Sequence, residues 1–84
     1  MNSILEISSR IKKLKTDKEI YNFLLEILTM SEVETLSKRW RILKMLNEGK
    51  TQREIAKELN VSLCKVTRGS KILKNKNSVI VKNL

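Results

Sequence analysis

Apolar residues recur every three or four positions along most of the chain, and this spacing is typical of one face of an α-helix. In residues 3–14 the apolar stripe consists of Ile4, Leu5, Ile7, Ile11 and Leu14. A second stripe follows Thr16 or Asp17 and consists of Ile20, Phe23, Leu24, Ile27 and Leu28. The pattern therefore predicts two amphipathic helices in the first third of the chain.

A third helix is predicted after Ser31. Ser31 and Glu34 have the spacing of a capping box, in which the hydroxyl accepts a backbone N–H and the carboxylate reaches back to the cap residue. Gly49 fits the end of this helix because glycine tolerates the positive φ found there. The expected apolar face consists of Val33, Leu36, Trp40, Leu43 and Leu46.

The same signals recur in a tighter arrangement after residue 50. Thr51 and Glu54 predict a capped helix over residues 52–59. Asn60 suits a left-handed turn, and Ser62 is placed to cap a fifth helix directly after it. Two short helices joined by such a turn predict a helix-turn-helix. A plain helical hairpin within a bundle is the alternative.

The apolar positions of residues 52–66 also fit this motif. Ile55 and Leu59 would face the core from the first helix, and Ala56 is small where the second helix would cross. Val61 would fill the space between the helices, and Val66 would hold the second helix down.

Length and composition favour one small all-α domain over residues 1–84. The chain has no proline and only two glycines, whereas sandwiches and barrels need many turn residues. A chain of this size has a thin core, so we expect it to gain burial by dimerising. We assign residues 1–48 to a helical dimerisation core and 50–74 to the helix-turn-helix. Residues 75–84 form a short C-terminal segment without a clear period, which could be a helix, an extended arm or a frayed end.

The charge suggests an anionic partner. The 18 Lys and Arg exceed the 9 Asp and Glu, which gives a net charge of +9. Small domains this basic commonly bind nucleic acid or an anionic membrane. A basic soluble protein without such a partner is the alternative, and RNA or membrane binding is a further one.

Several classes of protein are not expected. Cys64 is the single cysteine and there is no histidine, so neither a disulfide framework nor a metal site is predicted. No apolar run approaches the roughly 18 residues of a membrane span, and the first residues do not read as a secretory signal. We therefore expect an intracellular, cytoplasmic protein. No nucleophile with a visible base and no phosphate loop is present, so we expect no enzymatic activity.

A helix-turn-helix reads DNA with the start of its second helix in the major groove. Leu63 and Cys64 could contact thymine methyls there, and Lys65 and Thr67 could bond base edges or phosphates. The start of the first helix is placed for phosphate contacts. A solvated lysine is the alternative for Lys65. The predicted DNA-contacting residues are Gln52, Arg53, Leu63, Cys64, Lys65, Thr67 and Lys74.

Four stretches give the chain a resemblance to a known family. They are ILT at 27–29, KRWRIL at 38–43, GKTQREIAKELNVS at 49–62 and VTRGSKILK at 66–74. With these stretches the chain resembles the tryptophan operon repressor family. The resemblance implies an intertwined all-α homodimer that binds a palindromic double-stranded DNA operator, with L-tryptophan as its corepressor ligand.

The resemblance also assigns ligand-binding roles. Arg39 and Arg68 would sandwich the indole, and the Thr29 hydroxyl would hold the carboxylate. Backbone carbonyls near Leu28 of the partner chain would accept hydrogen bonds from the ammonium group, and Gly69 would lie against the ligand. An apolar residue would normally anchor the helix at Gly69. We therefore predict an open slot there and a loosely held second helix, such that Gly69→Leu blocks the ligand response but keeps the fold.

Three features depart from the family pattern. Ile72 stands where the family commonly has a serine near the ligand's amino group, and it offers no hydrogen-bond acceptor. The GKTQ loop is one residue shorter, and the C-terminal helix is reduced to about ten residues. The alternative function is therefore a helix-turn-helix regulator that binds no tryptophan. We expect Trp40 to pack in the core or dimer, and the alternative is that it walls the ligand pocket.

Overall fold

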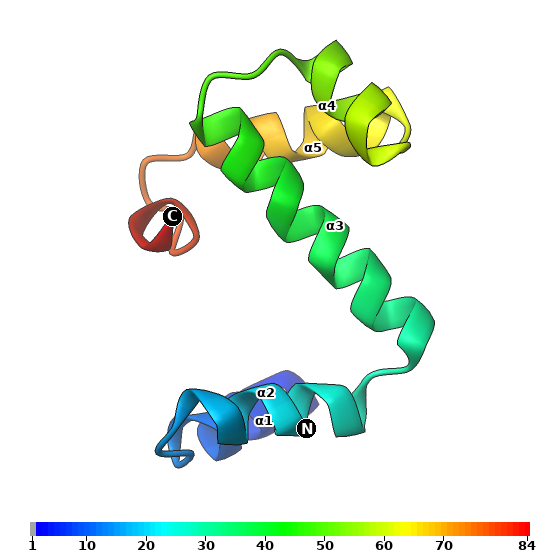
Figure 1. Cartoon of the computed structure of the whole chain (residues 1–84). Helices are drawn as coiled ribbons and strands as arrows, with labels where there is room; N and C mark the ends of the chain where they lie inside the picture. Colours follow the sequence, from blue (N-terminus) through cyan, green and yellow to red (C-terminus); the bar gives the residue numbers. More distant parts are fainter. Residues whose placement is uncertain (1) are drawn as a thin grey trace. The chain divides into compact units, whose positions relative to one another are not determined.

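Residues 2–84 are described by a computed structural model, in which five α-helices and one short 3-10 helix follow one another and no strand occurs (Figure 1). The prediction of an all-α chain is confirmed. The helices are α1 (Ser3–Lys12), α2 (Asp17–Ile27), α3 (Met30–Asn47), α4 (Gln52–Leu59), α5 (Leu63–Leu73) and the 3-10 helix η1 (Val81–Asn83).

The start of α3 differs from the prediction. Its cap is Thr29, whose Oγ1 accepts a hydrogen bond from the Glu32 N–H at 3.1 Å, while Glu32 Oε1 accepts from the Thr29 N–H at 2.8 Å. The capping box predicted at Ser31 is therefore wrong by two residues. Both positions have the same chemistry, and the earlier box allows α3 to begin two residues sooner and form more helical hydrogen bonds.

The other predicted ends and turns are confirmed. Thr16 caps α2, accepting from the Glu19 N–H at 3.1 Å. After α3, Gly49 adopts a φ of +92°, which an L-residue rarely adopts. Asn60, with φ of 53° and ψ of 52°, makes the left-handed turn after α4.

Helix α4 has the predicted bounds, and Thr51 Oγ1 accepts from the Glu54 N–H at 3.2 Å. The Glu54 carboxylate accepts from the Thr51 hydroxyl at 3.0 Å instead of reaching back to a backbone N–H. Ser62 occupies the N-cap position of α5, but its side chain makes no capping hydrogen bond. The position of that predicted cap is correct and its bond is absent.

The chain divides into two compact units, residues 1–34 and 35–84, and each is described here by itself. In the second unit, α3, α4 and α5 meet around a small apolar core. Ile55 and Val66 are fully buried, and Ile42 and Met45 join them from α3. Partly buried side chains complete this core, namely Leu46, Ala56, Leu59 and Val61. The residues predicted to hold the two short helices together therefore do so.

The first unit, which contains α1 and α2, has no buried residue in either helix. Its apolar stripes are at most partly covered, and several large side chains are exposed. Ile4 is 71% exposed, Leu5 65% and Tyr21 54%. Two short helices alone bury too little apolar surface to be stable.

The C-terminal segment is a series of turns, not a regular α-helix. Asn75 Oδ1 accepts from the Asn77 N–H at 3.0 Å, and the chain ends in the single turn of η1. Figure 1 shows it in orange and red after α5. The run at Val79 has no strand partner among the described residues, and Val79 itself is 74% exposed.

Candidate nucleic-acid interface and ligand groove

The α4–α5 pair presents most of the predicted DNA-contacting side chains to solvent. Leu63 is 47% exposed, and Cys64 and Lys65 beside it are exposed as well. Arg53 at the start of α4 and Lys74 after α5 are also exposed. The buried side of the pair is fixed by Ile55 and Val66, so the exposed first turn of α5 sits on a packed support.

Gln52 and Thr67, both predicted to contact DNA, are hydrogen-bonded to each other. The Thr67 hydroxyl lies 3.0 Å from Gln52 Oε1 and 3.0 Å from the Leu63 carbonyl oxygen, and it has one proton to donate. The bond to Gln52 ties the start of α4 to the first half of α5. It also leaves the Gln52 amide nitrogen as the group that can donate outward. Residue spacing alone did not reveal this pairing.

The charge of residues 50–74 is strongly one-sided. This segment contains seven Lys and Arg residues but only two glutamates, and α5 itself has no acidic residue. Lys50, in the loop before α4, forms an ion pair with Glu58 near the end of that helix, with 3.2 Å between Nζ and Oε2. An exposed ion pair of this kind contributes little to stability. The remaining cations produce a positive potential that attracts phosphates.

A small groove lies between α3 and α5, within the second unit. Its volume is about 40 Å³. The groove brings together Arg39 and Arg68, the two arginines that the resemblance assigns to the ligand, with Gly69 beside them. Lys65, predicted to read DNA, lines the same groove. The complete lining is Arg39, Ile42, Leu43, Lys65, Arg68, Gly69 and Ile72.

The space beside Gly69 is occupied by α3. A Cβ atom at this position would lie 2.9 Å from Ile42 Cγ2 and 3.3 Å from Leu46 Cδ1. Gly69 is buried, and α5 crosses the C-terminal half of α3 here (Figure 1). The prediction of an open slot beside Gly69 is therefore wrong. The loosely held helix and the folded Gly69→Leu variant stay predictions. Glycine suits this position because α5 approaches the side chains of α3 closely, and a Cβ atom would force Ile42 to shift.

Leu28 and Thr29 belong to the first unit. Leu28 is the C-cap of α2, in an extended conformation with φ of −99° and ψ of 145°. Because the Thr29 Oγ1 accepts the Glu32 N–H, its own proton stays free for donation to a carboxylate. The capping role and the ligand role predicted for Thr29 are thus chemically compatible.

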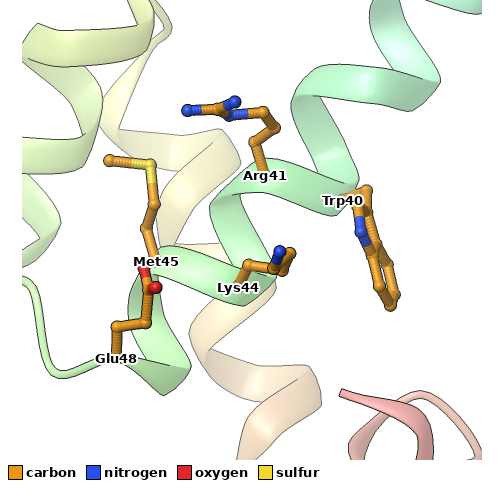
Figure 2. A pocket seen from close by; sticks show the side chains of 5 residues that line it. All are labelled: Trp40, Arg41, Lys44, Met45 and Glu48. Atoms are coloured by element: carbon orange, nitrogen blue, oxygen red, sulfur yellow. The ribbon is translucent and has the colours of Figure 1, made fainter.

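Trp40 does not line the groove between the arginines. It lies on a separate hollow of about 280 Å³ along α3, lined by Trp40, Arg41, Lys44, Met45 and Glu48 (Figure 2). Figure 2 shows the indole of Trp40 and the guanidinium of Arg41 leaving α3 in different directions. Trp40 is 43% exposed, so the predicted packing would require a second chain.

Residues 2–84 contain one cysteine, on α5. Cys64 is a free, exposed thiol. No group of three or more acidic or cysteine side chains in this range could hold a metal ion. None of the described helices has the length and apolar character needed to cross a membrane.

Comparison with known proteins places this chain in one family. A family described as Trp repressor protein matches residues 2–83. The Trp operon repressor homolog of Chlamydia caviae is 41% identical over 71 residues, which cover 83% of this chain and 67% of that protein. The homolog of Chlamydia trachomatis serovar D is 36% identical over 73 residues, which cover 86% of this chain and 74% of that protein.

A homolog from Xylella fastidiosa strain M23 is 48% identical over 52 residues, covering 61% of this chain and 56% of that protein. No solved structure matches significantly. Because the family match extends over nearly the whole chain, α1 and α2 included, the chain belongs to the Trp repressor family of DNA-binding regulators.

Proposed function

We propose that this protein is a transcriptional repressor that binds a palindromic operator in double-stranded DNA as a homodimer, with a corepressor bound beside α5. The observation that carries the proposal is the exposed, acid-free first turn of α5 on the packed α4–α5 pair. As a regulator of this kind it would act in the cytoplasm.

In this proposal the two helices have different tasks. The side chains of Leu63, Cys64 and Lys65 would meet base edges in the major groove. Arg53, Lys74 and the Gln52 amide would bind phosphates and set the register of the helix on the duplex. Thr67 would act through its hydrogen bond to Gln52, in addition to any contact of its own.

The first unit supports the homodimer. Neither α1 nor α2 has a buried residue, although both have helical apolar stripes. Exposed apolar surface on this scale usually marks an interface. A second copy of the chain would cover it, and Leu36 and Trp40 on α3 would join the covered surface.

The corepressor would bind between Arg39 and Arg68. Guanidinium groups stack on aromatic faces and bond carboxylates. The groove of one chain, about 40 Å³, is far smaller than the roughly 300–1,000 Å³ of small-molecule pockets, so one chain would supply only part of the site. The resemblance assigns the Thr29 hydroxyl to the ligand carboxylate and the backbone carbonyls near Leu28 of the partner chain to the ammonium group, and it implies L-tryptophan as ligand.

A second candidate is a regulator that binds DNA without tryptophan. It is favoured by Ile72, which lines the groove with a side chain that offers no hydrogen bond. The two candidates share the DNA-reading α4–α5 pair and differ only in the effector.

Selection from random double-stranded DNA, with and without L-tryptophan, tests the proposal. We expect an enriched palindrome with half-sites about one helical turn apart. Binding to that sequence should weaken steeply as salt rises, because several Lys and Arg release counterions. Stronger binding to RNA or to anionic vesicles than to any duplex would contradict the proposal, and enrichment unaffected by L-tryptophan would favour the second candidate.

A further inference from the structure

We infer that the turn directly after α5, residues 75–78, is an additional DNA-binding element, in which Lys76 contacts the phosphate next to the one that Lys74 binds. The inference rests on the proposed function and deepens it, because it extends the DNA-binding surface beyond the end of α5. None of the four residues of this turn is among the predicted DNA-contacting residues.

Two hydrogen bonds fix the shape of this turn. The Ser78 N–H donates to the Asn75 carbonyl oxygen at 3.1 Å, which closes a four-residue turn. The Asn77 N–H donates to Asn75 Oδ1 at 3.0 Å, so the asparagine side chain holds the turn as well. Lys76 and Asn77 are therefore the two central residues, and the Lys76 backbone is held at the tip of the turn.

The turn is also fixed to α5. The Lys74 N–H donates to the Ser70 carbonyl oxygen at 3.2 Å. The Asn75 N–H donates to the Ile72 carbonyl oxygen at 3.1 Å. These bonds extend from the end of α5 to the first residue of the turn, so no linker separates the two (Figure 1). Lys76 therefore keeps a set position relative to the helix that is proposed to enter the major groove.

The turn presents its lysine to solvent. Lys76 and Asn77 at the tip are exposed, and so is Lys74 before the turn. Ser78, which closes the turn, is partly buried, as are residues 80–81 after it. The chain is thus covered behind the turn, while the tip stays accessible to a partner.

The charge around the turn has one sign. Residues 59–84 contain six Lys and Arg and no Asp or Glu. Lys71, Lys74 and Lys76 follow one another at intervals of three and two residues. Within residues 2–84, no ion pair neutralises Lys74 or Lys76. A polyanion that approaches the end of α5 therefore meets unneutralised positive charge.

The spacing of Lys74 and Lys76 suits neighbouring phosphates of one DNA strand. The Cα atoms of residues two positions apart lie within about 7 Å of each other, and the phosphates of one strand follow at about 3.4 Å along the duplex axis. A phosphate contact by Lys74 therefore brings the neighbouring phosphate within reach of the flexible Lys76 side chain. Because the turn already holds the Lys76 backbone, binding has to order only that side chain.

Binding of the full chain to duplex DNA of random sequence, measured between about 50 and 200 mM salt, tests this inference. Each lost phosphate contact makes the slope of log K against log salt less steep by about 0.9, so the two chains of a dimer together lose about 1.8. The affinity lost in Lys76→Gln should therefore be about tenfold greater at the lower salt concentration than at the higher one. Lys76→Arg keeps the cation and should bind like the unchanged protein.

Matched variants separate the turn from net charge. Lys82→Gln removes the same charge from an exposed lysine of the same segment that lies outside the turn, and it should leave the slope unchanged. Asn75→Ala removes the side-chain acceptor of the turn and should weaken binding, whereas Asn77→Ala keeps that acceptor and should not.

A Lys76→Gln variant with the salt dependence of the unchanged protein would overturn the inference and leave the proposed function intact. Equal effects of Lys76→Gln and Lys82→Gln, or of the two asparagine variants, would also contradict it, because the loss would then not depend on the turn. Failure of the unchanged protein to bind any duplex would instead refute the proposed function, and this inference with it.

Discussion

At the scale of single residues, Gly69 shows how one position can be read in two ways. From the sequence, a glycine one turn after Val66 is a missing anchor. In the structure it is the point where α5 lies against α3, with Ile42 and Leu46 in the place of a side chain. The anchoring side chains come from α3 and pack onto the bare backbone of α5.

Replacing Gly69 with alanine should lower the free energy of unfolding by about 1 kcal/mol. Alanine favours a helix by about 1 kcal/mol over glycine, but overpacking a core costs about 1–3 kcal/mol. The second effect should win because Ile42 is only 2% exposed and its Cγ2 methyl has little freedom to move. Urea unfolding would measure the difference. A stabilised variant would mean that α3 and α5 can separate without cost.

At the scale of secondary-structure elements, the helix ends differ in what their caps contribute. The α4 cap, Thr51, bonds the Glu54 N–H, whereas Ser62 at the start of α5 makes no such bond. Both sites have a hydroxyl residue at the N-cap position, but only Thr51 has a glutamate three residues later. Only Thr51 makes a capping hydrogen bond. The position of α5 therefore depends on the burial of Val66 and Gly69.

Thr51→Ala should therefore destabilise the protein by about 1 kcal/mol, the usual loss for an N-cap. Ser62→Ala is the matched control and should change stability by less than about 0.5 kcal/mol, as for an uninvolved surface residue. Thermal or urea unfolding of both variants would check this. Equal losses at the two positions would show that Ser62 does cap α5 in solution.

At the scale of the whole molecule, the two units differ in their ability to stand alone. The second has a closed apolar core around Ile55 and Val66. The first has exposed large apolar side chains and no buried residue in its helices. The fold of the first unit should therefore depend on another copy of the chain.

We expect a solution mass of twice the 9.8 kDa of one chain and a Tm that rises with protein concentration, as for any folded state stabilised by association. Leu25→Glu, which replaces an exposed apolar side chain of α2 with a charge, should lower the Tm and shift the mass toward one chain. Ser9→Glu, on the exposed surface of α1, is the control and should do neither. Sedimentation would measure the solution mass of each variant, and thermal scans would measure its Tm. A monomer with a concentration-independent Tm would contradict the dimer.

The sequence by itself determined the helices, the α4–α5 pair and most of the turns. Helical periodicity, capping pairs and the special residues Gly49 and Asn60 act over three or four positions, so their signals are local. The resemblance carried by the TRGS stretch at 67–70 identified the family. Local chemistry also left one ambiguity, because two equivalent capping boxes compete at the start of α3.

Only the tertiary structure decided which side chains meet. The close approach at Gly69, the bond between Thr67 and Gln52 and the shared groove of Arg39, Lys65 and Arg68 join residues on different helices. Such contacts depend on how helices cross and pack, and the spacing of residues along one helix does not fix that geometry. For this reason the sequence indicated the candidate residues, and packing determined the arrangement in which they can act.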